Sequence, residues 1–147
     1  MNRGEIWLIN LDPTIGAEIR KTRPAVIVSR DGLGVLPLRV IVPITDWKER
    51  YSKASWMVKL EANQQNGLSK VSTADCFQVR SVSQKRMVKK IGSIGSSKLN
   101  EIEDPLAMEI LRGRFGQGSH IVVGVRKGEI VFREKKRKTR NITPGAQ

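Results

Sequence analysis

Residues 11–30 read LDPTIGAEIRKTRPAVIVSR, and this stretch decides the fold. A polar loop with one glutamate and several basic residues opens directly into an apolar run at Pro24. Because Pro24 has no N–H to donate, it is expected at the first residue of a strand. Arg23, just before it, is expected in an extended conformation. The alternation over residues 25–29 predicts a strand buried on both faces, with ionic side chains at its mouth.

Shorter apolar runs on either side of this stretch predict further strands. They are expected at residues 5–11, 36–44, 56–61, 73–81 and 86–91, separated by turn signals. After a Gly- and Ser-rich linker, apolar residues at helical spacing from Leu99 to Ile110 predict one helix, which Pro105 is expected to kink. The predicted fold class is α+β and mainly β, a small and strongly curved antiparallel barrel with a C-terminal helix.

The charge distribution bears on domain organisation. Residues 1–114 are expected to form one compact domain, and residues 115–147 a basic extension with a hairpin at 120–132 and then a disordered tail. The extension holds eight Lys/Arg and two Glu, a net of +6, so the total of +13 leaves +7 on residues 1–114. Basic charge therefore extends over the whole chain, and it favours an anionic partner.

Scarce residue types exclude several kinds of chemistry. The single cysteine, Cys76, rules out an intramolecular disulfide and is expected to be a buried structural thiol. The one histidine, His120, lies in the extension, so a two-histidine ribonuclease mechanism is not expected. The sequence has no P-loop, dinucleotide fingerprint or metal-ligand spacing, so neither a cofactor nor a metal is predicted. A cytoplasmic location is expected, because signal-peptide and membrane-spanning patterns are missing.

Arginine, hydroxyl and carboxylate groups remain as candidate chemistry. RNA can be cleaved by its own 2′-hydroxyl when a protein supplies a proton acceptor, a proton donor and positive charge beside the phosphorus. Arginine suits the last role, because its planar guanidinium binds two phosphoryl oxygens and stays charged. A threonine hydroxyl at a strand end can hold another oxygen in place. This route requires no metal.

Several ordered motifs resemble those of the MazF/PemK (Kid-like) toxin family. Residues 3–29 contain Gly4-Glu5-Ile6-Trp7, then Leu11-Asp12-Pro13, then Gly16-x-Glu18 followed by Arg23-Pro24. The family's Pro-x-Thr strand end resembles Val42-Pro43-Ile44-Thr45, and its Gln-x-Arg/Lys-Ser/Thr segment resembles Gln78-Val79-Arg80-Ser81. The resemblance covers about residues 3–112.

The resemblance implies an SH3-like barrel with an added helix, of the CcdB/PemK-like kind, that acts as a homodimer. Such proteins are toxins of type II toxin–antitoxin pairs. They are mRNA interferases, which cut single-stranded RNA at short motifs without metal and leave 2′,3′-cyclic phosphate and 5′-hydroxyl ends. The implied partners are single-stranded RNA, a cognate acidic antitoxin, a second copy of the chain and, for the toxin–antitoxin complex, operator DNA.

The resemblance also implies three catalytic residues. Arg23 matches the family's catalytic arginine, for proton transfer and charge stabilisation, with a surface ion pair to Glu18 as the alternative. Thr45 matches the catalytic threonine that hydrogen-bonds the scissile phosphate, or else is a plain strand-end residue. Glu18 matches an acidic loop position that orients Arg23 or helps to take the 2′-proton, or else is simply solvated.

The expected RNA-binding residues are Arg20, Lys21, Gln78, Arg80 and Asp75. Arg20 and Lys21 would contact phosphates, or else form a solvated face. Gln78 and Arg80 would line the groove, or else be outward residues of a strand. Some relatives, such as Kid, carry an Arg-x-Asp pair in the fifth strand together with a loop histidine. This chain lacks that arginine and that histidine, and Asp75 is expected to substitute only in part.

Two further features leave alternatives open. Trp47 and Trp56 could stack on bases, although core or dimer packing is favoured. The extension could be an RNA-affinity arm, a second docking element or a read-through tail without function. Two readings compete with an enzyme: a non-catalytic toxin of the same fold that inhibits a protein such as DNA gyrase, as CcdB does, and a basic module that only binds RNA.

Overall fold

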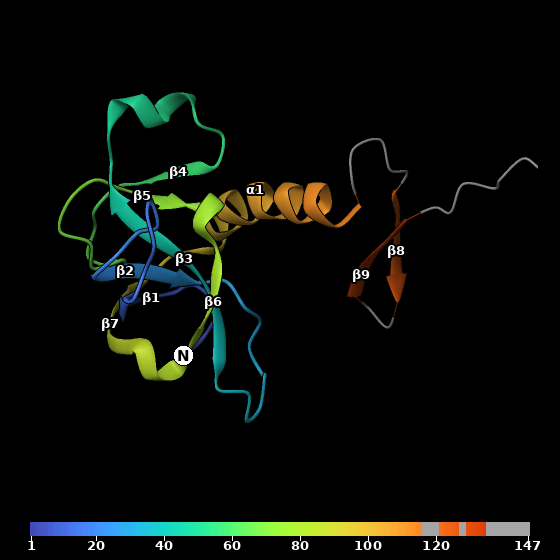
Figure 1. Cartoon of the computed structure of the whole chain (residues 1–147), viewed down its shortest axis with the longest axis horizontal. Coiled ribbons are helices and arrows are strands. Elements are labelled where there is room, and N and C mark those ends of the chain that lie inside the picture. The colour runs from blue at the N-terminus through green and yellow to red at the C-terminus, as the bar shows by residue number, and fades with distance from the viewer. Residues whose placement is uncertain (116–120, 127–128, 135–147) are drawn as a thin grey trace, which may run out of the picture. The chain divides into compact units, whose positions relative to one another are not determined.

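The computed structural model describes the backbone of residues 1–115, 121–126 and 129–134 and the side chains of residues 1–105. The chain divides into two compact units, Met1–Glu109 and Ile110–Gln147. The elements follow in this order (Figure 1): β1 (Glu5–Asn10), β2 (Thr22–Ile27), β3 (Leu38–Asp46), η1 (Glu49–Lys53), β4 (Met57–Leu60), β5 (Ser72–Asp75), η2 (Cys76–Gln78), β6 (Arg80–Ser83), η3 (Gln84–Arg86), β7 (Met87–Ser93), α1 (Ser96–Phe115), β8 (Ile121–Arg126) and β9 (Glu129–Glu134).

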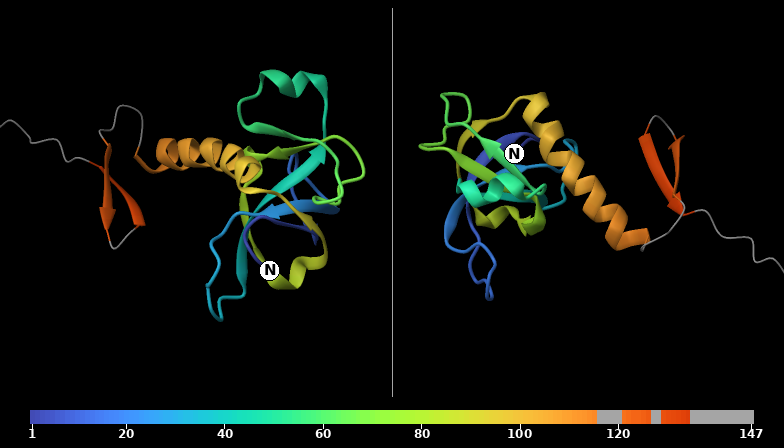
Figure 2. Two further views of the ribbon diagram at one scale, coloured as in Figure 1. Left: turned by 180° about the vertical axis from the view of Figure 1, so that it is seen from behind. Right: turned by 90° about the horizontal axis from the view of Figure 1, so that it is seen from above.

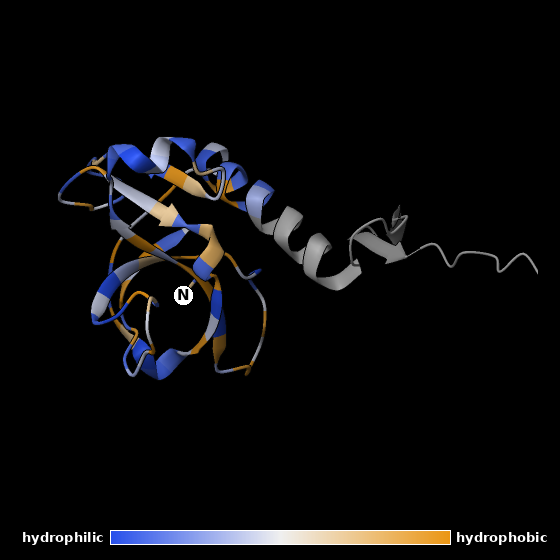
Figure 3. Ribbon diagram, turned by 45° about the horizontal axis from the view of Figure 1, so that its top comes forward, coloured by the Kyte–Doolittle hydropathy of each residue, from blue (hydrophilic) through white to orange (hydrophobic). Residues whose placement is uncertain are grey.

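The strands of the first unit form one antiparallel sheet. Its order is β4-β5-β3-β2-β1-β7, and β6 pairs with β3 off this path. The sheet is strongly curved (Figure 3). Among the described residues no ladder joins β4 to β7, so the sheet does not close. The predicted class, a mainly β and strongly curved antiparallel fold with one helix after these strands, is confirmed, although the barrel is not closed.

β2 contains the predicted strand but begins two residues before Pro24. The β1–β2 ladder runs from Ile6 opposite Val26 to Asn10 opposite Thr22 and so includes Pro24, while the β2–β3 ladder begins only at Ala25. Just after β2, the backbone N–H of Val28 donates to the carbonyl oxygen of Val40, the residue of β3 opposite it. Because the direction alternates along a strand, the other even-numbered residues of β2 also direct their N–H towards β3. Pro24 would direct an N–H towards β3, but the β2–β3 ladder does not extend to it. The proline therefore leaves no ladder hydrogen bond unmade and is tolerated inside the strand.

Burial on both faces of β2 agrees with the alternation of its side chains. Val26 belongs to one core cluster, whereas Ala25 and Ile27 belong to a second. The first cluster extends to Leu99 and Ile102 of α1 and thus fastens the start of the helix to the sheet. Each fully buried aliphatic side chain contributes about 1.5–3 kcal/mol, so these clusters fix the position of β2 and of the loop that precedes it.

β3 has two successive partners along one edge. It pairs with β6 from Leu38 to Ile41 and with β5 from Ile44 to Asp46. Pro43 lies in the gap between these two ladders, where a residue that cannot donate a hydrogen bond leaves no ladder bond unmade. Thr45 lies within β3 rather than just after it, because the strand continues to Asp46.

The strand expected at residues 73–81 is interrupted. The structure has β5, then the single turn η2, then β6, so the prediction of one continuous strand is wrong. Asp75 caps η2, since its side-chain oxygen accepts a hydrogen bond from the backbone N–H of Phe77 at 3.1 Å. This cap lets the chain leave β5 and pair with a different part of β3.

α1 runs through Pro105 as one helix, drawn as a continuous coil in both views of Figure 2. Leu99 and Ile102 are buried, as their spacing predicts. In the second unit β8 and β9 pair antiparallel where a hairpin was expected, but β9 continues two residues past 132, into the segment expected to be disordered. His120 and the expected disordered tail after residue 134 lie outside the described residues. In the part of the chain described, no helix is both long and apolar enough to span a membrane.

Candidate functional site

A cleft of about 360 Å³ opens where three separated stretches of chain meet. Its lining comes from the β1–β2 loop, from β3 and from the segment that joins η2 to β6: Glu18, Ile19, Pro43, Phe77, Gln78, Val79 and Arg80. The topology therefore brings three predicted site residues, Glu18, Gln78 and Arg80, to one cavity.

The β1–β2 loop is fastened at its base by hydrogen bonds. Asp12 Oδ1 accepts from the backbone N–H of Lys21 at 3.1 Å, and the backbone N–H of Leu11 donates to the carbonyl oxygen of Lys21 at 3.0 Å. Lys21 has φ of 69°, a left-handed conformation that is uncommon for a residue other than glycine. Nearer the tip, Glu18 Oε2 accepts from the backbone N–H of Ile15 at 3.3 Å. The loop thus has a defined conformation that presents Glu18 to the cleft.

Both ends of the Gln78 amide are occupied within the protein. Its Oε1 accepts from the backbone N–H of Ile19 at 2.6 Å, and its Nε2 donates to Asp75 Oδ2 at 3.1 Å and to the carbonyl oxygen of Ala17 at 3.5 Å. Asp75 is only 5% exposed, and burial raises the pKa of its carboxyl group. Two residues expected to bind RNA therefore join the β1–β2 loop to η2.

Arg23 and Thr45 lie on neighbouring strands, β2 and β3. In the β2–β3 ladder Ala25 is opposite Pro43, so the same register carried two residues further brings Arg23 level with Thr45. Side chains two residues apart share one face of a strand, and Pro43 lines the cleft, so both residues belong to the cleft face of the sheet. Neither is among the residues that line the cleft itself.

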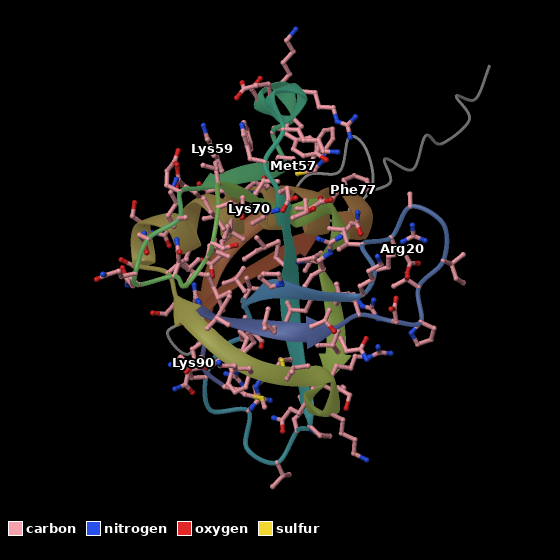
Figure 4. All side chains as sticks on the ribbon, turned by 90° about the vertical axis from the view of Figure 1, so that its left-hand side faces the viewer. Arg20, Met57, Lys59, Lys70, Phe77 and Lys90 are labelled. Atoms are coloured by element: carbon pink, nitrogen blue, oxygen red, sulfur yellow. The ribbon has the colours of Figure 1, made fainter. Side chains whose placement is uncertain are left out.

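Arg23 does not form the ion pair with Glu18 that was the alternative to a catalytic role. Its Nε donates to the carbonyl oxygen of Arg20 at 3.4 Å. Within residues 1–105, for which side chains are described, Arg23 and Glu18 form no ion pair. Arg23 is half-buried at the end of the loop. Arg20 is exposed on that loop, as Figure 4 shows.

Arg80 and Arg86 hold the start of the β1–β2 loop. Arg80, which is half-buried and lines the cleft, donates from Nη1 to the carbonyl oxygen of Leu11 at 3.4 Å. Arg86 donates from Nη1 to the carbonyl oxygens of Asn10 and Asp12. Sequence reasoning missed Arg86, because a basic residue before a lysine-rich strand gives no signal of a contact with the far end of β1.

An exposed aromatic pair lies at the edge of the cleft. Phe77, which is 65% exposed, lines the cleft, and its ring centroid is 5.8 Å from that of Trp56. Phe77 was missed in the sequence because it falls inside a run that reads as a buried strand; Figure 4 labels it on η2. Trp47 instead packs edge-on against Tyr51 at 6.2 Å, with Lys59 Nζ 5.0 Å from its ring centroid.

Cys76 is a structural residue, as expected. It is fully buried in the core cluster that includes Ile102, and its Sγ lies 3.6 Å from the carbonyl oxygen of that residue. Burial, together with the nearby Asp75 carboxylate, raises the pKa of the Cys76 thiol to about 12. The thiolate that a nucleophile requires is therefore strongly disfavoured.

Comparison with known sequences gives consistent matches. Residues 2–109 match the family model described as PemK-like, MazF-like toxin of type II toxin–antitoxin system. The chain is 30% identical to endoribonuclease MazF9 of Mycobacterium tuberculosis over 116 residues, which cover 75% of this chain and 96% of that protein. It is 35% identical to endoribonuclease PemK of Escherichia coli over 104 residues, which cover 69% and 76%.

Comparison with solved structures gives the same fold. The crystal structure of MazF from Deinococcus radiodurans aligns with a TM-score of 0.64 at 23% identity and covers 75% of this chain and 96% of that one. A crystal structure of MazE–MazF from the same organism aligns with a TM-score of 0.58 at 24% identity, with coverage of 75% and 95%.

Proposed function

The chain belongs to the PemK-like, MazF-like toxin family of type II toxin–antitoxin systems, and from that premise we propose that it is an endoribonuclease that cleaves single-stranded RNA. Two relatives that cover most of its length are named endoribonucleases. The proposal is supported by Glu18, which lines the cleft, and by the pairing of Ala25 with Pro43, because Arg23 and Thr45 lie two residues away from that pair on the same two strands. Inhibition of DNA gyrase is not favoured, because both relatives are endoribonucleases.

The proposed reaction uses the RNA as its own nucleophile. The 2′-oxygen forms a bond to phosphorus, the bond from phosphorus to the 5′-oxygen breaks, and the products carry a 2′,3′-cyclic phosphate and a 5′-hydroxyl. One proton leaves the 2′-hydroxyl and one reaches the departing 5′-oxygen. No water, metal or cofactor enters this balance.

Each catalytic role follows from the chemistry of one side chain. The Arg23 guanidinium stabilises the negative charge that builds on the phosphoryl oxygens, because its planar fork matches those oxygens. In the proposed reaction Arg23 also donates the proton that the departing 5′-oxygen receives, and it regains a proton from Glu18 or from solvent after the bond has broken. The Thr45 hydroxyl donates to another phosphoryl oxygen. Glu18, the one carboxylate among the described residues that line the cleft, takes the proton of the 2′-hydroxyl.

RNA is proposed to follow the basic and aromatic edge of the cleft. Arg20 and Lys21 are exposed on the loop and bind phosphates, while Arg80 binds a phosphate from the opposite wall. Phe77 and Trp56 offer exposed ring surface on which unpaired bases stack. Stacking accepts every base, so the sequence preference of cleavage must come from polar contacts to base edges.

RNA and an acidic antitoxin are proposed to compete for the surface around the cleft. The chain is proposed to act as a homodimer and to be silenced by a cognate acidic antitoxin, as a MazE–MazF complex is known for a structural neighbour. The net charge of +7 on residues 1–114 supports both an acidic protein and RNA as ligands. Operator DNA is proposed as a ligand of the toxin–antitoxin complex only.

The proposal also covers the cellular location of the protein and the boundaries of its catalytic domain. Cleavage of cellular RNA requires the cytoplasm, and we place the protein there on that ground. Residues 1–114 are proposed to be the catalytic domain, with residues 115–147 as a basic extension outside the family match.

Primer-extension mapping of cut sites on a long RNA tests the proposal. Purified full-length protein in EDTA is expected to cut at a short recurring motif, with 5′-hydroxyl ends on the downstream fragments. Arg23→Ala is the matched control and should leave the RNA intact. Intact RNA after incubation with folded wild-type protein would refute the enzyme.

A further inference from the structure

Both polar atoms of the Gln78 amide are hydrogen-bonded within the protein. Its oxygen accepts from the backbone of Ile19 at 2.6 Å, and its nitrogen has acceptors at Asp75 and at Ala17. Two of these three partners belong to the β1–β2 loop, which carries Glu18. Gln78 therefore fastens the loop near its tip, 59 residues away in sequence, whereas Asp12 fastens it at its base.

Asp75 determines which way the Gln78 amide faces. A carboxylate can only accept, so the NH₂ group of Gln78 must point towards Asp75 and the carbonyl oxygen towards the Ile19 N–H. Asp75 is itself immobilised, because it is 5% exposed and its other oxygen accepts from the backbone N–H of Phe77 at 3.1 Å. A chain of hydrogen bonds thus leads from Asp75, the buried cap of η2, through Gln78 to Ile19 in the loop.

We propose that Gln78 is a positioning residue, which, oriented by Asp75, holds the β1–β2 loop so that Glu18 faces the cleft. The role rests on the proposed RNA cleavage, in which Glu18 takes a proton. It replaces the expectation that Gln78 and Asp75 bind RNA directly. Ile19 is the residue that follows Glu18 in the chain, so a hydrogen bond at its N–H fixes the peptide that carries the glutamate.

The role predicts an effect on the chemical step rather than on RNA binding. Without the anchor, the loop retains its base at Asp12 and Lys21, and the RNA-binding arginines remain. Arg20, which follows Ile19, has a long exposed side chain that can still reach a phosphate, whereas the shorter Glu18 side chain loses its placement. Because misplacement by about 1 Å costs up to about 100-fold in rate, kcat should fall while KM stays nearly constant.

Four variants of the full-length chain test this. Gln78→Met removes the hydrogen bonds at similar side-chain length, and Gln64→Met is the matched control, since Gln64 is exposed and does not line the cleft. Gln78→Glu places a carboxylate against that of Asp75. The double variant Asp75→Asn with Gln78→Glu reverses the pair, because the amide introduced at position 75 donates to the carboxylate introduced at position 78, which still accepts from the Ile19 N–H.

Two measurements separate this role from the others. In RNA-free protein, amide hydrogen exchange at Ile19 is expected to be about tenfold faster in Gln78→Met, unchanged in Gln64→Met, faster in Gln78→Glu and restored in the double variant. In cleavage assays at neutral pH, kcat should fall about 10- to 100-fold in Gln78→Met with KM within about twofold, and the double variant should recover most of it.

The same measurements can overturn the proposal. Unchanged exchange at Ile19 in Gln78→Met would show that Gln78 does not hold the loop. A raised KM or an altered cut motif with unchanged kcat would show that Gln78 contacts RNA. If wild-type protein leaves RNA intact, the proposed function fails, and hydrogen exchange still decides by itself whether the anchor exists.

Discussion

Arg80 spans the wall of the cleft to reach Leu11, whose carbonyl oxygen accepts a hydrogen bond from Nη1 at 3.4 Å. This contact uses one of the five N–H groups of the guanidinium. The side chain is therefore held in place by the residue that follows β1. Its remaining donors have no hydrogen bond within residues 1–105 and lie at the cleft that Arg80 lines. Arg80 can thus bind a phosphate without first being ordered.

Arg80→Lys should weaken RNA binding. Lysine keeps the charge but cannot hold the Leu11 carbonyl and a phosphate with one planar group, so KM is expected to rise about three- to tenfold with little change in kcat. Steady-state cleavage of a fluorescent RNA measures both constants, with Lys85→Arg, an exposed position outside the cleft lining, as control. An unchanged KM would remove Arg80 from the RNA contacts.

Arg23→Ala should reduce kcat by at least about 100-fold, because it removes the cation that stabilises charge on the phosphoryl oxygens. Arg23→Lys keeps a charge without the fork and should recover only a small part of the rate. Single-turnover cleavage in EDTA measures the chemical step. Full activity of the lysine variant would show that charge alone suffices at this position.

Thr45→Val should lose activity, whereas Thr45→Ser should keep most of it. Valine has nearly the same shape and lacks the hydroxyl, so the loss reports the hydrogen bond to the scissile phosphate, worth about 10- to 100-fold in kcat. Thr73→Val, on the opposite residue of β5, tests whether a threonine in this ladder matters for folding alone. Equal kcat for Thr45→Val and wild type would exclude a catalytic hydroxyl.

Glu5 should make stability depend on acid pH. Burial raises the pKa of Glu5, but hydrogen bonds from Trp7, from the backbone of Asn2 and from Lys90 outweigh it and lower the pKa to about 2. The carboxylate therefore stabilises the fold above pH 4.5, its ordinary value, and this contribution is lost as the pH falls towards 2.

Glu5→Gln is the corresponding variant. It should reduce the free energy of unfolding by about 1–3 kcal/mol at neutral pH, and the difference from wild type should shrink between pH 4.5 and 2. Urea titrations at several pH values measure it, with Glu61→Gln, at an exposed position, as control. A difference that stays constant over this range would contradict the assignment.

Truncation after Arg114 should preserve cleavage. The family match ends at residue 109, and every residue proposed to act on RNA precedes it. The truncated chain is expected to keep kcat within about threefold of the full chain, because an appendage outside the site moves the chemical barrier by less than about 1 kcal/mol. Circular dichroism verifies that it folds. A folded but inactive protein would assign the extension a catalytic or dimerising function.

The local pattern of the sequence predicted most strands, because burial and alternation are properties of neighbouring residues. It placed β1, β2 and β3 to within about three residues, and through them the cleft face that carries Arg23 and Thr45. The break at η2 was not predicted, since it depends on a cap that Asp75 makes to Phe77. The side-chain pattern of residues 73–81 predicted one continuous strand and did not indicate the turn at η2.

The contacts across the cleft could not be predicted from the sequence. Gln78 meets Ile19 only because β6 pairs with β3 and the β1–β2 loop folds over that pair, and no local signal encodes this distance. The same holds for the exposure of Phe77. The catalytic roles that the motifs indicated therefore stay predictions, whereas the hydrogen-bond partner of each side chain could be read only from the fold.

The burial of β2 on both faces constrains how such a protein can diversify. Ala25, Val26 and Ile27 each belong to one of two cores, so this half of the strand offers no outward surface on which a substitution is tolerated. The loop before it and the turn at residues 76–78 carry the exposed side chains at the cleft. A new target preference must therefore arise at these two edges, while the strand between them is inherited unchanged.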